Sequence, residues 1–365
     1  MKGLVFVHKA NKKYISIIVG SLLILAAVIF GLRHDAGLYS TPVAQVTAIT
    51  KTTSTAETDS FNNHDRRIVQ HVRVRLLNTK RRGQTVVLRN TYVKSQALDF
   101  PLRSGQQVFL THSKDGYQLN DTKRDTLLGG LLVVTVLLLI IFAGKHALVT
   151  LISITLNAAI FFWGVHHELA LQGKGPWLLV GGLALVFTVL TVLFVIGVRP
   201  VAVCIALSTV LATALSVALG YGIMTGTGYH GIHLETVKYV TQQPQLIFFF
   251  QIVIGSLGAV LDETSDISVA IFQLPASRKE RFMAGMAIGR SVMGPLIAVL
   301  FMIFMADTFV ETILWLRNNN TIAYTVSWVM GLGFTQSLIS AFGIVLAVPL
   351  TSGLAALLPG RGQEA

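Results

Sequence analysis

The sequence contains 365 residues, of which 53% are hydrophobic and only 13% are charged, and its mean hydropathy is +0.65. Soluble domains carry about 25% charged residues, so this composition excludes an ordinary soluble protein and indicates a polytopic protein in a lipid bilayer. The formal net charge of +12 does not call for a nucleic acid partner, because Lys and Arg residues also orient membrane proteins and attract anionic head groups.

A basic leader opens the chain, with Lys2, Lys9, Lys12 and Lys13 ahead of the apolar run 14–32. This run is long enough to cross the roughly 30 Å hydrocarbon core, and the basic leader should stay in the cytoplasm. A cleaved signal peptide is the alternative, but its apolar region would span only about 7 to 15 residues and no good A-x-A cleavage site follows. We therefore expect an uncleaved signal anchor in residues 1–33.

Residues 34–125 change from continuous apolar runs to alternating apolar and polar positions, which is typical of strands. The alternation occurs in residues 43–49, 68–76, 85–88 and 107–110. Gly83, Gly105 and Gly116 separate the later runs as turn residues would. The sequence predicts an extracytoplasmic β-rich domain, a small OB-like barrel of about five strands, between the first and second spans.

Two further features mark this domain. The Thr- and Ser-rich spacer 51–67 is interpreted as a mobile loop. Residues 33–125 carry 15 Lys and Arg against 8 Asp and Glu, a net charge of +7. Such a surface favours anionic lipid head groups, wall polymers or an acidic partner, although a solvated surface that binds nothing is the simpler interpretation.

Seven more apolar runs form a predicted helical membrane domain in residues 126–365, so we expect eight spans in all. They occupy residues 127–143, 147–165, 177–197, 200–220, 246–274, 284–306 and 334–357. With the leader inside, each cytoplasmic connection carries Lys or Arg, which places both termini in the cytoplasm. Residues 308–333 mix aromatic and polar side chains, and we interpret them as an external interfacial helix and loop.

Three carboxylates interrupt the run 246–274: Asp262, Glu263 and Asp266. An Asp at the centre of a membrane helix costs about 2.5 to 3.5 kcal/mol, so such groups usually belong to a pathway or a buried site. Asp262 and Asp266 repel each other unless a proton or a cation intervenes. The acids lie either at the cytoplasmic interface, after a short span, or within the membrane on a longer helix. One helical stripe joins Gly255, Gly258, Ala259, Asp262, Ser265 and Asp266.

The following span supplies a candidate partner. A connection near Ala276 folds this span back antiparallel, which returns Arg290 to the level of Asp262. We expect an ion pair from Arg290 to Asp262 or Asp266. Small residues suited to close helix packing, followed by a helix breaker, surround it: Gly285, Gly289, Gly294 and Pro295.

Other interpretations of these charges remain open. In one interpretation the carboxylates and Arg290 have the structural role of holding two helices together. In the other they form an ion or substrate pathway. An intramembrane aspartyl protease would need an Asp on each of two spans, whereas the facing span offers Arg290 and Ser291, so we expect that the protein is not an enzyme. Walker loops, dinucleotide fingerprints and Cys/His zinc spacings do not occur in the sequence, and its one cysteine, Cys204, lies in an apolar run. We expect no cofactor and no metal, and the pairs at His166 and His230 are more typical of interfacial polar residues.

The segment GSLGAVLDETSDIS, followed by GRSVMG, resembles the YibE/F-like family of multi-spanning bacterial membrane proteins. Its first motif, similar to G-A-x-G-A-x-x-D, places Gly255, Gly258, Ala259 and Asp262 on the family pattern. A second motif, similar to G-R-D-x-x-G-T, is matched by Gly289, Arg290 and Gly294, while Ser291 and Pro295 depart from it. The resemblance implies an integral protein of the bacterial plasma membrane, permease-like activity, and a sibling subunit or a second copy as partner.

The sequence thus predicts transport or export of a small solute or ion. Asp262, Asp266 and Arg290 would form the ion-responsive group, with Glu263 and Ser265 as accessories. The alternative is a non-catalytic membrane scaffold, in which the external domain binds a partner and the charged helix pair is structural.

Overall fold

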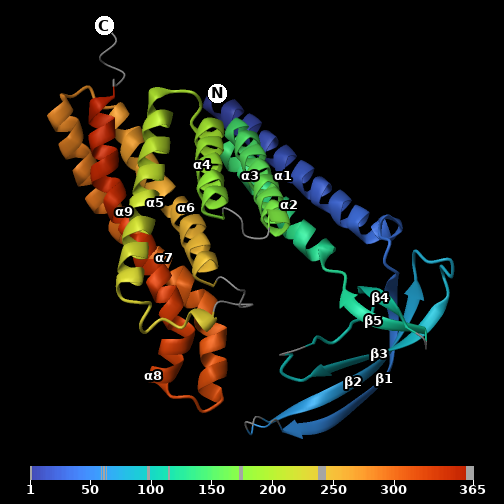
Figure 1. The fold of residues 1–365 in the computed structure, drawn as a ribbon. Coiled ribbons are helices and arrows are strands. Elements are labelled where there is room, and N and C mark those ends of the chain that lie inside the picture. Colours follow the sequence, from blue (N-terminus) through green and yellow to red (C-terminus); the bar gives the residue numbers. More distant parts are fainter. Residues whose placement is uncertain are drawn as a thin grey trace. The chain divides into compact units, whose positions relative to one another are not determined.

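The computed structural model describes residues 2–58, 60, 62, 64–96, 99–113, 116–171, 176–236 and 244–358. It contains two compact units, Met1–Gly144 and Lys145–Ala365. Figure 1 shows a strand-rich part in the first unit and a helical second unit. The division groups the second span with the first unit, whereas the sequence had assigned everything after residue 125 to one membrane domain.

The first unit consists of two long helices with a sheet between them. Helix α1 (Lys2–His34) and the short 3-10 turn η1 (Asp35–Leu38) lead into the strands, and α2 (Asp125–Ala143) follows them. The strands are β1 (Val43–Thr58), β2 (His64–Leu76), β3 (Thr85–Val93), β4 (Gln107–Ser113) and β5 (Gly116–Thr122). They form one antiparallel sheet in the order β3-β2-β1-β4-β5, and the outer strands β3 and β5 also approach each other. The predicted β-rich domain is confirmed.

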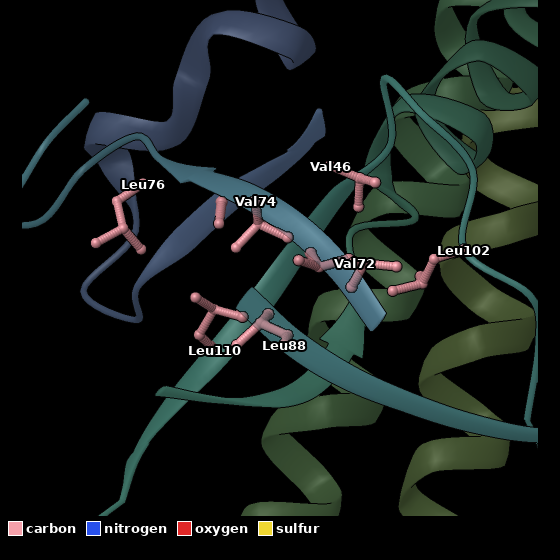
Figure 2. Packing of buried hydrophobic residues seen from close by; sticks show 9 residues of the cluster. Val46, Val72, Val74, Leu76, Leu88, Leu102 and Leu110 are labelled. Atoms are coloured by element: carbon pink, nitrogen blue, oxygen red, sulfur yellow. The ribbon is translucent and has the colours of Figure 1, made fainter. Parts of the chain in front are cut away.

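Alternation of side chains builds the core of this sheet. Val72, Val74 and Leu76 are fully buried, while Arg73 and Arg75 between them are exposed. Figure 2 shows these aliphatic side chains meeting those of neighbouring strands. The period of two therefore places the apolar residues on one face, as the sequence predicted.

The expected loop at residues 51–67 is wrong. Strand β1 continues to Thr58 and pairs with β2, with Thr53 opposite Val69 and Thr58 opposite His64. The segment KTTSTAET is rich in Thr, whose β-branched side chain favours the extended backbone. Its side chains are polar because most of this long hairpin is exposed, and a polar composition alone does not indicate a loop.

A buried charge network joins the two helices of the first unit to the sheet. The Lys123 side chain is fully buried, and its Nζ lies 2.6 Å from carboxylate oxygens of both Asp35 and Asp125. Nζ also donates to the carbonyl of Leu32, at the end of α1. The Tyr39 hydroxyl donates to Asp125 at 2.9 Å, and burial together with this hydrogen bond raises the pKa of Tyr39 to about 12.

The second unit is a helix bundle. Its helices are α3 (Lys145–Leu171), α4 (Pro176–Val195), α5 (Pro200–Gly226), α6 (Pro244–Phe272), α7 (Arg278–Arg317), α8 (Ile322–Thr325) and α9 (Gly331–Leu357). Within the described parts of the two units, eight helices are long and apolar enough to cross a membrane, as predicted. Both units together therefore supply the expected spans.

Helices α5, α6 and α9 pack closely against one another at glycines. A Cβ atom on Gly343 of α9 would lie 2.9 Å from Val260 of α6, and one on Gly220 of α5 would lie 2.7 Å from Ile339 of α9. Each of these positions therefore admits little more than a hydrogen atom. Close backbone approach of this kind is the usual way in which membrane helices gain packing energy.

The expected interfacial helix at residues 308–333 is partly wrong. Helix α7 continues without a break to Arg317 and has 40 residues, a length of about 60 Å, because no glycine or proline follows Pro295 within it. The chain turns at residues 318–321 and then forms α8 and a π-helical turn, Val326–Met330. Figure 1 shows α8 at the turn between α7 and α9.

Candidate functional site

The three carboxylates of α6 divide between two faces of the helix. Asp262 and Asp266 are exposed on the chain, whereas Glu263 has no exposed surface. Successive residues of a helix are rotated by about 100°, so neighbours in sequence point in different directions. The sequence identified the stripe that carries Asp262 and Asp266, but it could not tell that this stripe points outward from the chain.

Glu263 lies on the face of α6 that packs into the bundle. One turn before it, Val260 packs with Ala212 of α5 and with Ile344 and Ala347 of α9. One turn after it, Ile267 faces Gly289 of α7. Neither carboxylate oxygen of Glu263 has a hydrogen-bond partner among the residues that the structure describes. The helix bundle thus encloses an ionisable group without satisfying it.

Buried hydroxyl groups share this interior. Thr264 of α6 and Thr209 of α5 are hydrogen-bonded at 2.8 Å, and Ser216 of α5 donates to the carbonyl of Ile339. The hydroxyls of Thr213 and Thr351 are buried without a partner in the described part of the chain. Other buried hydroxyl residues of α5, α6 and α9 are Ser208, Ser256, Ser268, Ser337, Ser340 and Ser352. Polar side chains are therefore buried at the interfaces between these three helices.

The expected ion pair of Arg290 is not formed. No ion pair found among the described residues joins Arg290 to Asp262 or Asp266. The neighbouring Gly289 would place a Cβ 3.0 Å from Ile267, which puts Arg290 at the level of Asp266, about one turn from the predicted level of Asp262. The helical phase does not agree: Gly289 faces inward, and Arg290, one step around the helix, is exposed.

The other predicted residues take different surroundings. A Cβ on Gly289 would lie 2.5 Å from Val348, and one on Gly255 would lie 3.4 Å from Gln336. Added Cβ atoms on Gly258 and Gly294 would meet nothing within 4 Å among the described atoms. Ala259 and Ser265 are half-buried. Close packing by small residues thus occurs at Gly289 but not along the stripe beside Asp262.

Arg281 is a buried cation that the sequence interpretation missed. Arg281 is only 1% exposed. Its Nη1 atom donates to the carbonyl of Leu358 at 2.9 Å, and its guanidinium lies 5.3 Å from the ring centre of Phe272. Its Nε and Nη2 atoms have no partner within the described segments. Arg281, Gly285 and Gly289 are spaced by four residues, so the inward stripe of α7 could have identified this arginine.

The histidine cluster after α5 has a structural environment. His233 is hydrogen-bonded to Glu235 at 3.1 Å and to Ser327 at 3.2 Å, and its ring stacks on Trp328 with the ring centres 3.7 Å apart. A backbone hydrogen bond and then His233 lower the pKa of Glu235. The side chains of His167 and Glu168 lie outside the described residues. In the described part of the chain, no three metal-binding side chains come together.

Comparisons with known proteins agree with the order of parts along the chain. The YibE/F-like protein family matches residues 131–361, and the YibE/F family N-terminal domain matches residues 37–123. Neither the curated proteins nor the solved structures contain a significant match. The two matched regions correspond to the helical part and to the sheet. Since the first of them covers more than half of the sequence, the chain belongs to the YibE/F-like family of integral membrane proteins.

Proposed function

We propose that this protein is a permease that couples the movement of a small solute to a proton or a cation, with Glu263 as the group that binds the ion. The observation that supports this proposal is the complete burial of the Glu263 carboxyl without a hydrogen-bond partner among the described residues. An isolated carboxylate in an apolar bundle costs several kcal/mol. Binding of a proton or a cation relieves that cost, so occupancy of this group depends on the ion supply.

The surroundings of Glu263 support the same function. Hydroxyl residues are buried on three helices of the same bundle, and one of them, Thr264, directly follows Glu263 and is hydrogen-bonded to Thr209 of α5. Asp262 and Asp266, on the adjoining exposed face of α6, supply further carboxylates within one turn of Glu263. In this assignment Glu263 is the central group, and Asp262 and Asp266 attract the ion. The alternative of a structural charge pair lacks this support, because Arg290 forms no ion pair with Asp262 or Asp266 among the described residues.

The test is ion flux in liposomes that contain the purified full-length protein. A pH-sensitive dye inside the liposomes reports proton entry after a potassium diffusion potential is imposed with valinomycin, and a parallel series replaces the proton gradient with a Na⁺ gradient. Glu263→Gln preserves the shape of the side chain and removes the charge. We expect the flux of this variant to fall to that of protein-free liposomes.

Glu311→Gln is the matched control, because it makes the same change on a different helix, near the C-terminal end of α7. We expect it to retain the wild-type flux. Both variants must elute as monodisperse species and keep the wild-type helical circular dichroism. Wild-type flux in Glu263→Gln, or no flux of either ion in the wild type, would contradict the proposal.

A further inference from the structure

A large basic hollow lies in the first unit. Its volume is about 1290 Å³, and its wall comes from the end of α1, the strands β1, β2 and β4 with their connections, and the start of α2. Four arginines line it: Arg33, Arg75, Arg82 and Arg103. They come from three parts of the sequence, since Arg75 and Arg82 belong to the same hairpin, and the fold brings these parts to one cavity.

The protein leaves this hollow with a net positive charge. None of the four arginines takes part in an ion pair found among the described residues, and no Asp or Glu belongs to the lining. Lys123 also lines the hollow, and its two carboxylate partners, Asp35 and Asp125, exceed its charge by one, so the four arginines keep the hollow positive overall. Planar guanidinium groups bind phosphate oxygens through paired hydrogen bonds, which makes arginine the preferred residue for phosphate recognition. The hollow is therefore suited to a phosphate-bearing anion.

The position of the hollow selects the kind of phosphate compound. Ile29 and Leu127 also line it, and these residues belong to the first and second apolar helices. Leu127 is 66% exposed, so an apolar surface leads directly into the basic cavity. A phospholipid presents this combination, because its acyl chains lie beside apolar helix surfaces and its phosphate lies where those helices leave the hydrocarbon.

A neutral group in the lining adds a contact for the head group. Gln107 donates its Nε2 hydrogen to the Arg33 carbonyl at 2.8 Å, while its buried Oε1 atom has no donor among the described residues. A hydroxyl group of the ligand can supply that missing donor. Glycerol head groups carry hydroxyls, whereas choline head groups carry a cation that the arginines repel.

We propose that this hollow binds the head group of an anionic glycerophospholipid, with its phosphate on Arg33, Arg75, Arg82 and Arg103. The site is independent of the proposed ion pathway, and its test does not require transport. The acyl chains run along the apolar surface that includes Ile29 and Leu127, and the Gln107 side chain accepts a hydrogen bond from the glycerol.

Binding is measured by native mass spectrometry of the full-length protein, titrated in detergent with phosphatidylglycerol. The test variant replaces Arg75, Arg82 and Arg103 with Gln. A basic residue near a membrane surface contributes about 1 kcal/mol, so we expect the dissociation constant of the tightest phosphatidylglycerol site to rise about a hundredfold. Each single replacement should raise it about fivefold, which keeps the test valid if the triple variant folds poorly.

The matched control replaces Arg66, Arg73 and Arg89 with Gln. These three exposed arginines belong to the same sheet and do not line the hollow. It removes the same charge, and we expect the dissociation constant to stay within about twofold of the wild type. Equal weakening in the test and control variants would overturn the proposal, because it would indicate attraction by net charge alone. Equal affinity for phosphatidylcholine, or equally tight binding of free glycerol phosphate, would also overturn it.

Discussion

Replacement of Lys123 should loosen the junction between the sheet and its two helices. Lys123→Met keeps most of the volume of the side chain but leaves the carboxylates of Asp35 and Asp125 without their cation. Loss of one partner of a buried ion pair costs about 3 to 5 kcal/mol. The side chains of Asp35 and Asp125 are 12% and 25% exposed, so water relieves part of this cost. We therefore expect about 3 kcal/mol, at the lower end of that range.

Hydrogen exchange with mass spectrometry can measure this change in the full-length protein. All four tryptophans lie in the second unit, so their fluorescence does not report on the junction. Peptides that cover η1 and β4 do report on it, because Asp35 belongs to η1 and the Gln107 carbonyl of β4 accepts a hydrogen bond from the Lys123 backbone N–H. A loss of about 3 kcal/mol corresponds to exchange about a hundredfold faster where local opening limits the rate.

Two further variants decide whether the charge network is responsible. Lys80→Met changes an exposed lysine in the turn between β2 and β3, and the exchange of this variant should match the wild type. Adding Asp35→Asn and Asp125→Asn to Lys123→Met removes the uncompensated charges, and we expect part of the protection to return. Unchanged exchange in Lys123→Met would refute the reasoning, because it would show that the buried pair contributes nothing to the junction.

Two more predictions follow from the packing and from the network. Gly289→Ala would place a Cβ 2.5 Å from Val348, so overpacking should cost about 1 to 3 kcal/mol and lower the thermal midpoint measured by tryptophan fluorescence. Gly258→Ala has open space at its Cβ and should keep the wild-type midpoint. Equal midpoints for the two variants would contradict the close contact at Gly289. Because the pKa of Tyr39 is raised to about 12, its neutral hydroxyl stabilises the junction fully below about pH 10 and this contribution is lost as the pH rises through 12. Ultraviolet titration of tyrosinate should therefore show a late ionisation in the wild type that Tyr39→Phe lacks, and identical curves would contradict it.

The sequence was sufficient for the features that depend on long or regular patterns. Apolar runs of about 20 residues predicted the spans, and the alternation in residues 68–76 predicted an inward face that contains Val72 and Val74. The long hairpin was missed because its exposed, Thr-rich strands look like a polar linker. Helix α7 was divided too early because aromatic and polar residues suggested an interface where the backbone simply continues.

The candidate site depended on rotations that the sequence does not specify. Periodicity grouped Asp262 with Asp266, but it did not reveal which stripe of α6 meets the bundle, so Glu263 was treated as an accessory. For the same reason, the sequence did not show that Gly289 faces inward while the adjacent Arg290 is exposed. Arg281 was not identified as a candidate, although its spacing from Gly285 and Gly289 indicates an inward position.

The continuous length of α7 has a mechanical consequence. One hydrogen-bonded rod carries both the close contact at Gly289 and the segment that ends at Arg317, about 40 Å away along the axis. Proline removes a backbone hydrogen bond, so Pro295 is the most compliant point between them. A force that tilts the far end of this rod must either bend it at Pro295 or move Gly289 against Ile267, one turn from Glu263. A movement of the C-terminal end of α7 can thus reach the contact between Gly289 and Ile267, one turn from the buried Glu263.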